Sequence, residues 1–255
     1  VIESVVDTNL GTLMAFSDSG RGYSYPMSEL PIDSFVNVSE IFKLAKNEKI
    51  SNIMSYSNAD YKYVIFITEQ GMIKKTELKE YKTKGARGSQ AIRLREGDSI
   101  CRILFMNEED IGLLSANGQF MRFATSDIAP VGKIAMGVAG AKLNSGDKII
   151  DARALYPDVK EIVSLTSDGM ISRTPLDSLP KTNRNVKGTK IQKVNDGETL
   201  VGFVAMSECG DIITTTGLTA IKFNTREVSL TGRGALGVKA LKLKAKEKAT
   251  GIMGV

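Results

Sequence analysis

The sequence has no histidine, no tryptophan and only two cysteines among its 255 residues. Without histidine, the chain itself provides no Ser-His-Asp triad, no histidine-ligated zinc site and no imidazole general base. Cys101 and Cys209 form no CxxC pattern, so we expect two buried free thiols in a reducing cytoplasm. Carboxylate catalysis stays open, but the 29 acidic residues form no recognisable paired motif. We therefore predict no catalytic residue and no metal site in this chain.

Long apolar runs are absent as well. No segment approaches the roughly 18 residues that a membrane-spanning helix needs, so we expect a protein without membrane contact. The chain begins at Val1, without methionine or a signal-like start, which we interpret as a fragment of a longer protein. Its content of 42% hydrophobic and 25% charged residues is ordinary for a globular protein with a sizeable core.

Positive charge is present in excess and is unevenly placed. The formal net charge is +5, yet the first 55 residues hold 4 Lys or Arg against 7 Asp or Glu. The remaining residues hold 30 against 22, with basic clusters within 71–95, 181–193 and 222–248. One cluster alone would indicate only a solvated face, but three clusters at similar intervals indicate a shared structural origin.

One sequence pattern occurs five times along the chain. Residues 68–81, TEQGMIKKTELKEY, and 166–179, TSDGMISRTPLDSL, are its clearest copies. A turn glycine marks each copy at Gly20, Gly71, Gly118, Gly169 and Gly217, although the fifth copy needs one inserted residue. A second landmark follows in the last four copies, at Gly88, Gly137, Gly188 and Gly237. A period near 50 residues is typical of solenoids, propellers and other arrays.

Each copy has the pattern of strand, tight turn, strand, loop and strand. Ile92 and Leu94 alternate with Arg93 and Arg95, which is the period-two pattern of a half-buried strand. Only SEIFKLAK could form a short helix. We predict an all-β, propeller-like domain over residues 1–255. Its five blades are expected at about 1–55, 56–105, 106–155, 156–205 and 206–255.

These repeats resemble a known family. The stretches FITEQGMIKKTELKEYK and LNSGDKIIDARAL are similar to the C-terminal domain of the A subunit of bacterial type IIA DNA topoisomerases, and the resemblance covers essentially the whole chain. It implies a β-pinwheel, in which blades exchange strands with their neighbours and a basic outer rim binds and bends duplex DNA. The strand-cleaving tyrosine would lie in a preceding region, so we expect this chain to be non-catalytic.

The resemblance also implies a bacterial, cytoplasmic and nucleoid-associated location, together with partners and cofactors. Duplex DNA, the ATPase B subunit and the remainder of the A subunit would be partners, with ATP and Mg used only by other domains of the parent enzyme. DNA gyrase carries a QRRGGKG box that residues 84–90, KGARGSQ, and 231–237, TGRGALG, do not match. The first repeat looks like a second blade, which would place such a box upstream of Val1. We prefer the A subunit of topoisomerase IV, with that of DNA gyrase second.

Phosphate-led binding with little sequence preference is the mechanism that the basic residues favour, because the chain lacks interleaved aromatic residues for base stacking. The predicted DNA contacts are the basic residues nearest the blade loops: Lys74, Lys75, Lys84, Arg87, Arg122, Arg173, Lys181, Arg184, Lys187, Lys222, Arg226 and Arg233. The alternative is a propeller that binds a protein partner, and the acidic first repeat is compatible with it.

Overall fold

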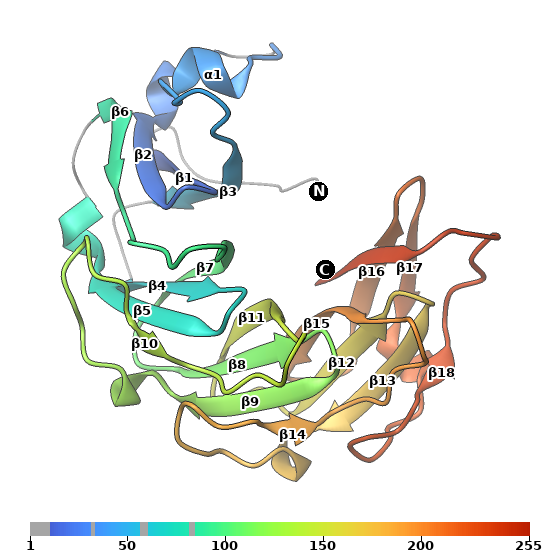
Figure 1. Cartoon of the computed structure of the whole chain (residues 1–255). Coiled ribbons are helices and arrows are strands. Elements are labelled where there is room, and N and C mark those ends of the chain that lie inside the picture. Colours follow the sequence, from blue (N-terminus) through green and yellow to red (C-terminus); the bar gives the residue numbers. More distant parts are fainter. Residues whose placement is uncertain (1–10, 32–33, 57–60, 82–84) are drawn as a thin grey trace. The chain divides into compact units, whose positions relative to one another are not determined.

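The computed structural model describes residues 11–31, 34–56, 61–81 and 85–255, which form five antiparallel sheets with short helices between them (Figure 1). The predicted all-β class, with one sheet for each repeat, is confirmed. The helix predicted within SEIFKLAK begins earlier than expected, since α1 spans Val38–Ile41 and Asn37 caps it by accepting from the Ser39 amide.

A hairpin opens every sheet, and a third strand pairs with its first strand. The hairpins are β1 (Thr12–Ser17) with β2 (Arg21–Pro26), β4 (Tyr63–Thr68) with β5 (Met72–Glu77), β8 (Asp110–Ser115) with β9 (Gln119–Ala124), β12 (Glu161–Thr166) with β13 (Met170–Pro175), and β16 (Asp211–Thr216) with β17 (Ala220–Asn224). The third strands are β3 (Ile50–Tyr56), β7 (Ile100–Met106), β11 (Ile149–Leu155), β15 (Leu200–Met206) and β19 (Ala249–Gly254). Short 3-10 helices follow each hairpin: η1 (Met27–Glu29), η2 (Leu78–Tyr81), η3 (Thr125–Asp127), η4 (Leu176–Ser178) and η5 (Thr225–Glu227).

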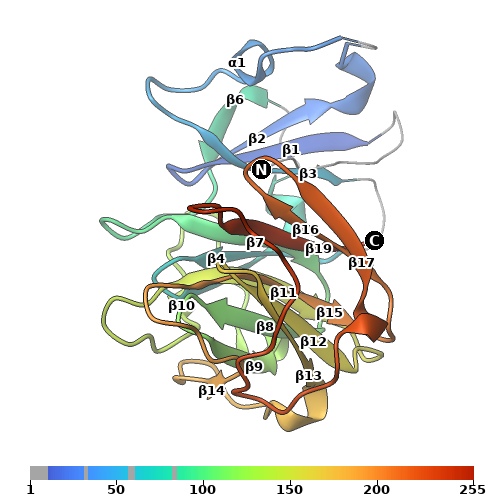
Figure 2. The ribbon, with the colours of Figure 1, turned by 90° about the vertical axis from the view of Figure 1, so that its right-hand side faces the viewer.

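A fourth strand, supplied by the following repeat, completes four of the sheets. These exchanged strands are β6 (Gly85–Gln90) beside β2, β10 (Val138–Ala139) beside β5, β14 (Thr189–Lys190) beside β9 and β18 (Val238–Lys239) beside β13. Figures 1 and 2 show β14 running along β9, where Thr189 pairs with Phe120. Within the described residues the fifth sheet has three strands, in the order β17, β16, β19. The second landmark of each repeat is therefore the strand that joins it to its predecessor.

Two glycines explain how the turns and the exchange are built. Gly169 has a φ of +82° at the β12–β13 turn, as the sequence predicted. Gly237 has a φ of +89°, and a Cβ there would lie 2.2 Å from the Ile171 carbonyl oxygen. Only glycine lets the exchanged segment approach β13 this closely. Gly217, in contrast, is not among the residues with positive φ: it directly follows β16, whereas Gly169 directly precedes β13.

The chain divides into two compact units, each with its own core. The first comprises Val1–Thr68, Met72–Asn107 and Ile128–Val138, and the second comprises Glu69–Gly71, Glu108–Asp127 and Ala139–Val255. Ile128–Val138 follows β9 in sequence but belongs to the first unit, since the Val131 amide donates to the Lys75 carbonyl oxygen on β5 at 2.8 Å.

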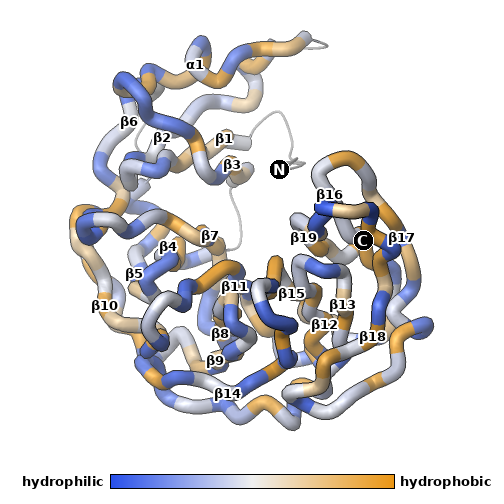
Figure 3. Tube along the Cα trace, turned by 45° about the vertical axis from the view of Figure 1, so that its right-hand side comes forward, coloured by the Kyte–Doolittle hydropathy of each residue, from blue (hydrophilic) through white to orange (hydrophobic). Residues whose placement is uncertain are grey.

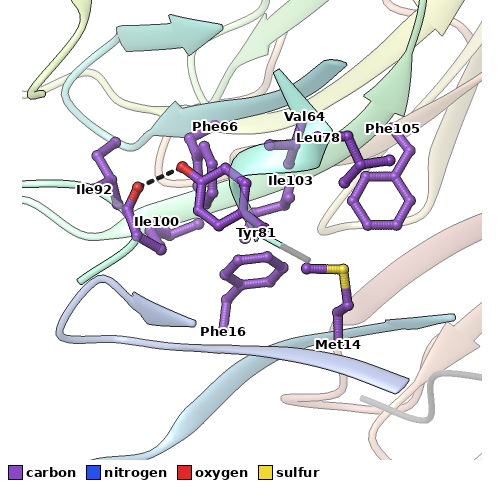
Figure 4. Close-up of a cluster of buried hydrophobic side chains, with 11 residues drawn as sticks. Met14, Phe16, Val64, Phe66, Leu78, Tyr81, Ile92, Ile100, Ile103 and Phe105 are labelled. Atoms are coloured by element: carbon purple, nitrogen blue, oxygen red, sulfur yellow. Dashed lines mark hydrogen bonds between the residues drawn. The ribbon is translucent and has the colours of Figure 1, made fainter. Parts of the chain in front are cut away.

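Neighbouring sheets within each unit pack face to face through aromatic side chains. In the first unit, Phe16 of β1 meets Phe66 of β4 edge-on, with ring centroids 5.3 Å apart, and Tyr81 packs beside them (Figure 4). In the second unit, Phe120 and Phe203 meet in the same way at 5.4 Å. The strands β4 and β12 bury all six of their residues. Figure 3 shows hydrophobic and hydrophilic residues interspersed along the trace.

Candidate nucleic-acid interface

One basic residue recurs at the same register position on the second strand of four sheets. These residues are Lys75, Arg122, Arg173 and Lys222, opposite Ile65, Gly112, Val163 and Ile213. All four were predicted DNA contacts. In the last three of these sheets, the first strand begins with an acidic residue, Asp110, Glu161 or Asp211. The hairpin register brings each acid beside the base of its own sheet.

The side chains of these four basic residues have partners within their own sheets. Arg122 Nε lies 3.2 Å from Asp110 Oδ2, Arg173 Nη2 lies 2.8 Å from Glu161 Oε2, and Lys222 Nζ lies 2.8 Å from Asp211 Oδ2. The hydrogen bond from Lys222 lowers the pKa of Asp211 below its usual value. Lys75 instead places its ammonium 4.1 Å from the centre of the Tyr63 ring. The basic residues that recur on the second strands therefore stabilise the hairpins that carry them.

Two of the predicted DNA contacts also hold neighbouring repeats together. Arg173 Nη1 donates to the carbonyl oxygens of Thr225 at 3.0 Å and Val228 at 2.8 Å, in the segment that follows β17. Lys181 reaches from the fourth repeat to Asp110 Oδ1 at 2.7 Å, so Asp110 joins two basic residues. Both side chains therefore have structural partners within the second unit.

Lys74 and Lys75 have buried side chains, with 0% and 2% of their surface exposed. Neither residue presents its ammonium to solvent in this structure, so we leave both out of the candidate interface. Lys84 lies outside the described residues. Arg87, Lys187 and Arg226 are exposed, and none of them forms an ion pair with any part of the chain that the structure describes.

A second basic position recurs in all four copies of the second landmark, five residues after its glycine. Its members are Arg93, Lys142, Lys193 and Lys242, and all four are exposed. Within the described residues, none of their side chains takes part in an ion pair or a hydrogen bond. The predicted contacts did not include this position, although the landmark alignment that established the repeat contains it.

Backbone bonds bring three members of this position next to a basic residue of the following repeat. The amides of Arg93, Lys142 and Lys193 donate to the carbonyl oxygens of Ala135, Val186 and Ala235, at 3.3, 3.0 and 2.9 Å. A basic residue lies two positions before each acceptor: Lys133, Arg184 and Arg233. We call the resulting combinations basic pairs: Arg93 with Lys133 in the first unit, and Lys142 with Arg184 and Lys193 with Arg233 in the second.

The loop members of the basic pairs differ in exposure. Arg233 is exposed, whereas Lys133 and Arg184 are half-buried. Arg184 Nη1 donates to the Ala139 carbonyl oxygen at 3.0 Å, and the Lys133 ammonium lies 5.4 Å from the centre of the Tyr81 ring. The sequence predicted Arg184 and Arg233 but missed Lys133, which occupies the equivalent place in its own loop. The three basic pairs are the strongest candidates for contacting a polyanion.

Other kinds of site lack a counterpart in the residues described. Over 11–31, 34–56, 61–81 and 85–255, no group of three or more His, Cys, Asp or Glu is placed to hold a metal ion. None of the helices among those residues has the length and apolar character to cross a membrane.

A sequence profile of the family described as "DNA gyrase C-terminal domain, beta-propeller" matches residues 11–32, 62–101, 110–155, 160–205 and 219–255. Curated relatives carry the name of the A subunit of DNA gyrase. That of Ureaplasma parvum is 29% identical over 98% of this chain and 31% of its own length. Those of Mycolicibacterium smegmatis and Escherichia coli are 31% and 29% identical over 91% and 95% of this chain. The chain thus spans less than a third of these relatives' length.

Two solved structures share the fold. The crystal structure of the C-terminal domain of DNA topoisomerase IV has a TM-score of 0.87 at 23% identity, covering 97% of this chain and 80% of that one. The structure of a DNA gyrase A C-terminal domain has a TM-score of 0.84 at 23% identity, with coverages of 98% and 84%. Together with the profile match, these likenesses confirm the β-pinwheel fold class.

Proposed function

Because the chain belongs to the family of DNA gyrase C-terminal domains, we propose that it binds duplex DNA through the three basic pairs, largely without sequence preference. The observation that carries this proposal is the recurrence of the pairs. Between Arg93 and Arg233 of the described chain, each place where two consecutive repeats meet presents one basic residue from each repeat. A duplex offers phosphates at regular intervals, and a repeated basic element is suited to that regularity.

Phosphate contact is the chemistry that these residues support best. The members Arg93, Lys142 and Lys193 have exposed side chains with no ion-pair partner in the described chain, so binding DNA breaks no internal bond. Lysine and arginine on phosphate fix the position of the duplex and carry little sequence information. The basic side chains that form ion pairs with Asp110, Glu161 and Asp211 would first have to leave these carboxylates before they could bind phosphate.

A salt series with matched variants tests this proposal. The wild-type chain, K142A/R184A and the control K46A/K160A would be compared for duplex binding by fluorescence anisotropy. Both variants lose two positive charges, and Lys46 and Lys160 are exposed residues outside the pairs. We expect the slope of log K against log salt to fall by about 0.9 for each phosphate that the variant no longer binds, and only in K142A/R184A. Equal slopes in both variants would refute the assignment of the pairs.

We further propose that the chain bends DNA for the strand-passage core of a type IIA topoisomerase. Bending a 20–30 bp site by 40–90° costs roughly 1–6 kcal/mol, so several phosphate contacts acting together would be needed to offset it. The B subunit and the rest of the A subunit are the proposed partners, with ATP and Mg used outside this chain. DNA cleavage is likewise proposed to take place in another part of the enzyme. The proposed location of the enzyme is the bacterial cytoplasm.

The choice between the two enzymes has a direct test. The curated relatives carry the name of DNA gyrase, which favours gyrase over topoisomerase IV, the assignment first preferred from the residues. Ligating nicked circles in the presence of the chain would shift their linking number if it wraps DNA, as the gyrase assignment requires. Bending without such a shift would support topoisomerase IV. A lack of DNA binding at low salt would favour a protein-binding propeller.

A further inference from the structure

Lys74 of β5 is a fully buried lysine with every ammonium proton in use. Its Nζ donates to the Tyr81 hydroxyl at 3.0 Å and to the backbone oxygens of Ala91 and Lys133. The rings of Phe66 and Tyr81 lie within cation–π range, with centroids 5.2 and 5.8 Å from Nζ. An ammonium has three donors, and three oxygens accept from it here.

The fold does not require a cation at this position. The equivalent residues on the second strands of the first, third and fourth sheets are Tyr23, Met121 and Ser172, and all three are buried. We call the place where a segment of the next repeat meets the second strand of a sheet a joint. Ser172 makes the equivalent joint without a charge, since its Oγ lies 3.0 Å from Thr231 Oγ1 in the exchanged segment. The charge of Lys74 therefore calls for a reason beyond closing the joint.

That reason lies in the two backbone oxygens that Lys74 contacts. Ala91 lies two residues before Arg93, and Lys133 is the other member of the same basic pair. The Tyr81 hydroxyl also donates to the Ala91 oxygen at 2.7 Å (Figure 4, dashed line). A single buried ammonium thus connects the two backbone segments that carry Arg93 and Lys133.

Further bonds show that these segments meet at one place in the first unit. The Lys133 amide donates to Glu80 Oε2 at 2.9 Å, and the Arg93 amide donates to the Ala135 oxygen at 3.3 Å. Among the described residues, the charged or titratable groups that face Lys74 are Glu80 and Tyr81 of η2 and Lys133 of the exchanged segment. Glu80 favours the ammonium, whereas Lys133 opposes it.

We propose that Lys74 is a positioning residue, whose ammonium holds the Ile128–Val138 segment on β5 and thereby sets Lys133 beside Arg93. The inference rests on the proposed function only for the role of that pair, which is DNA contact. The positioning of Lys133 by Lys74 does not depend on DNA. When the Ile128–Val138 segment opens, the hydrogen bond from Lys74 to the Lys133 oxygen breaks and Lys74 is exposed to water.

The first test compares K74M with the wild-type chain by amide hydrogen exchange in the absence of DNA. Methionine occupies the equivalent place in β9 as Met121, which is 1% exposed, so the variant has a precedent within the fold. We expect the Val131 and Arg93 amides to exchange at least about tenfold faster, as loss of a hydrogen bond to a charged group implies. The Thr182 and Thr231 amides, which close the equivalent joints on Arg122 and Arg173, serve as internal controls. Unchanged exchange at Val131 and Arg93 would overturn the proposal.

A second test removes one of the three acceptors and leaves Lys74 in place. In Y81F the hydroxyl that accepts from Lys74 Nζ and donates to the Ala91 oxygen is lost. We expect the Val131 and Arg93 amides to exchange faster than in the wild type but more slowly than in K74M, because Lys74 keeps its two backbone oxygens. The Thr231 amide should not change. Wild-type exchange at Val131 and Arg93 in Y81F would contradict the proposal, whether or not K74M folds.

Failure of this inference can be separated from failure of the proposed function. R93A/K133A tests whether the pair contacts DNA, through the salt slope of binding. The exchange experiments test whether Lys74 positions the pair, in the free chain. A wild-type salt slope in R93A/K133A, together with faster Val131 exchange in K74M or Y81F, would reject DNA contact there and retain the positioning role.

Discussion

At the scale of single residues, Arg173 shows how a periodic base becomes part of the structure. Its side chain is 12% exposed and joins Glu161 to two carbonyl oxygens of the next repeat. We expect R173A to lower the free energy of unfolding by about 3 kcal/mol, because a buried carboxylate and two oxygens lose their partner. R226A, at an exposed residue without an ion pair in the described chain, should change it by less than about 0.5 kcal/mol. Urea unfolding measures both, and equal losses would contradict this role.

Glu48 makes the first unit sensitive to acid. Burial alone would raise its pKa, but hydrogen bonds from Ser17, Tyr23, the Ala45 amide and Ser19 outweigh burial and lower the pKa from 4.5 to about 2. A depressed carboxyl pKa contributes stability that is present above pH 4.5 and is lost as pH falls toward 2. E48Q should therefore be less stable at pH 7 and lose less stability across that range. E40Q, at an exposed residue of α1, should behave like wild type in the same acid titration.

The sequence predicted the period of the basic residues but not which of them are paired. Arg122 and Arg173 each lie 12 residues after their carboxylates, Asp110 and Glu161, a spacing that was readable once the hairpin was assigned. The burial of Lys74 was not readable, because lysine is almost never fully buried and its partners are backbone oxygens far along the chain.

At the scale of elements, the exchanged segment depends on one glycine at its point of entry. In G237A the new Cβ would lie 2.2 Å from the Ile171 oxygen, at a φ of +89° that side chains rarely adopt. We expect a loss of at least about 1–3 kcal/mol from the backbone conformation alone. Gly232 begins the same loop, has nothing within 4 Å of its Cβ position and serves as the control, G232A. Similar thermal unfolding of the two variants would refute this account of the joint.

The strands and turns were largely predictable at this scale, whereas their partners were not. Alternation and the turn glycines indicated a strand, a turn and further strands in each copy, and the hairpins agree. The pairing of β18 with β13 depends on contacts between residues far apart, Lys239 and Met170, which local patterns do not encode. In the fifth turn, Gly217 takes the first position and not the last, and it lacks the positive φ expected of a turn glycine.

At the scale of the whole molecule, the proposed function predicts that DNA stabilises the fold. A ligand that binds only the folded chain raises its apparent stability by mass action. Each basic pair spans two consecutive repeats, so bound DNA should oppose the separation of their joints. We expect duplex DNA to raise the Tm at low salt and to lose this effect as salt screens the phosphates. A heparin-like polyanion should act similarly, and a Tm independent of both would argue against DNA binding.

The exchange of strands also has a consequence for synthesis on the ribosome. The third sheet begins at Asp110, but its last strand, Thr189–Lys190, is translated only after the fourth repeat has begun its own hairpin. Every such sheet therefore leaves the ribosome with an unsatisfied edge and waits for the following repeat to emerge. The sequence repeat that a gene duplication would copy therefore does not coincide with the complete sheet, which takes its fourth strand from the following repeat. A nascent chain stalled between two repeats would be most exposed to chaperones and proteases at the edge of its last sheet.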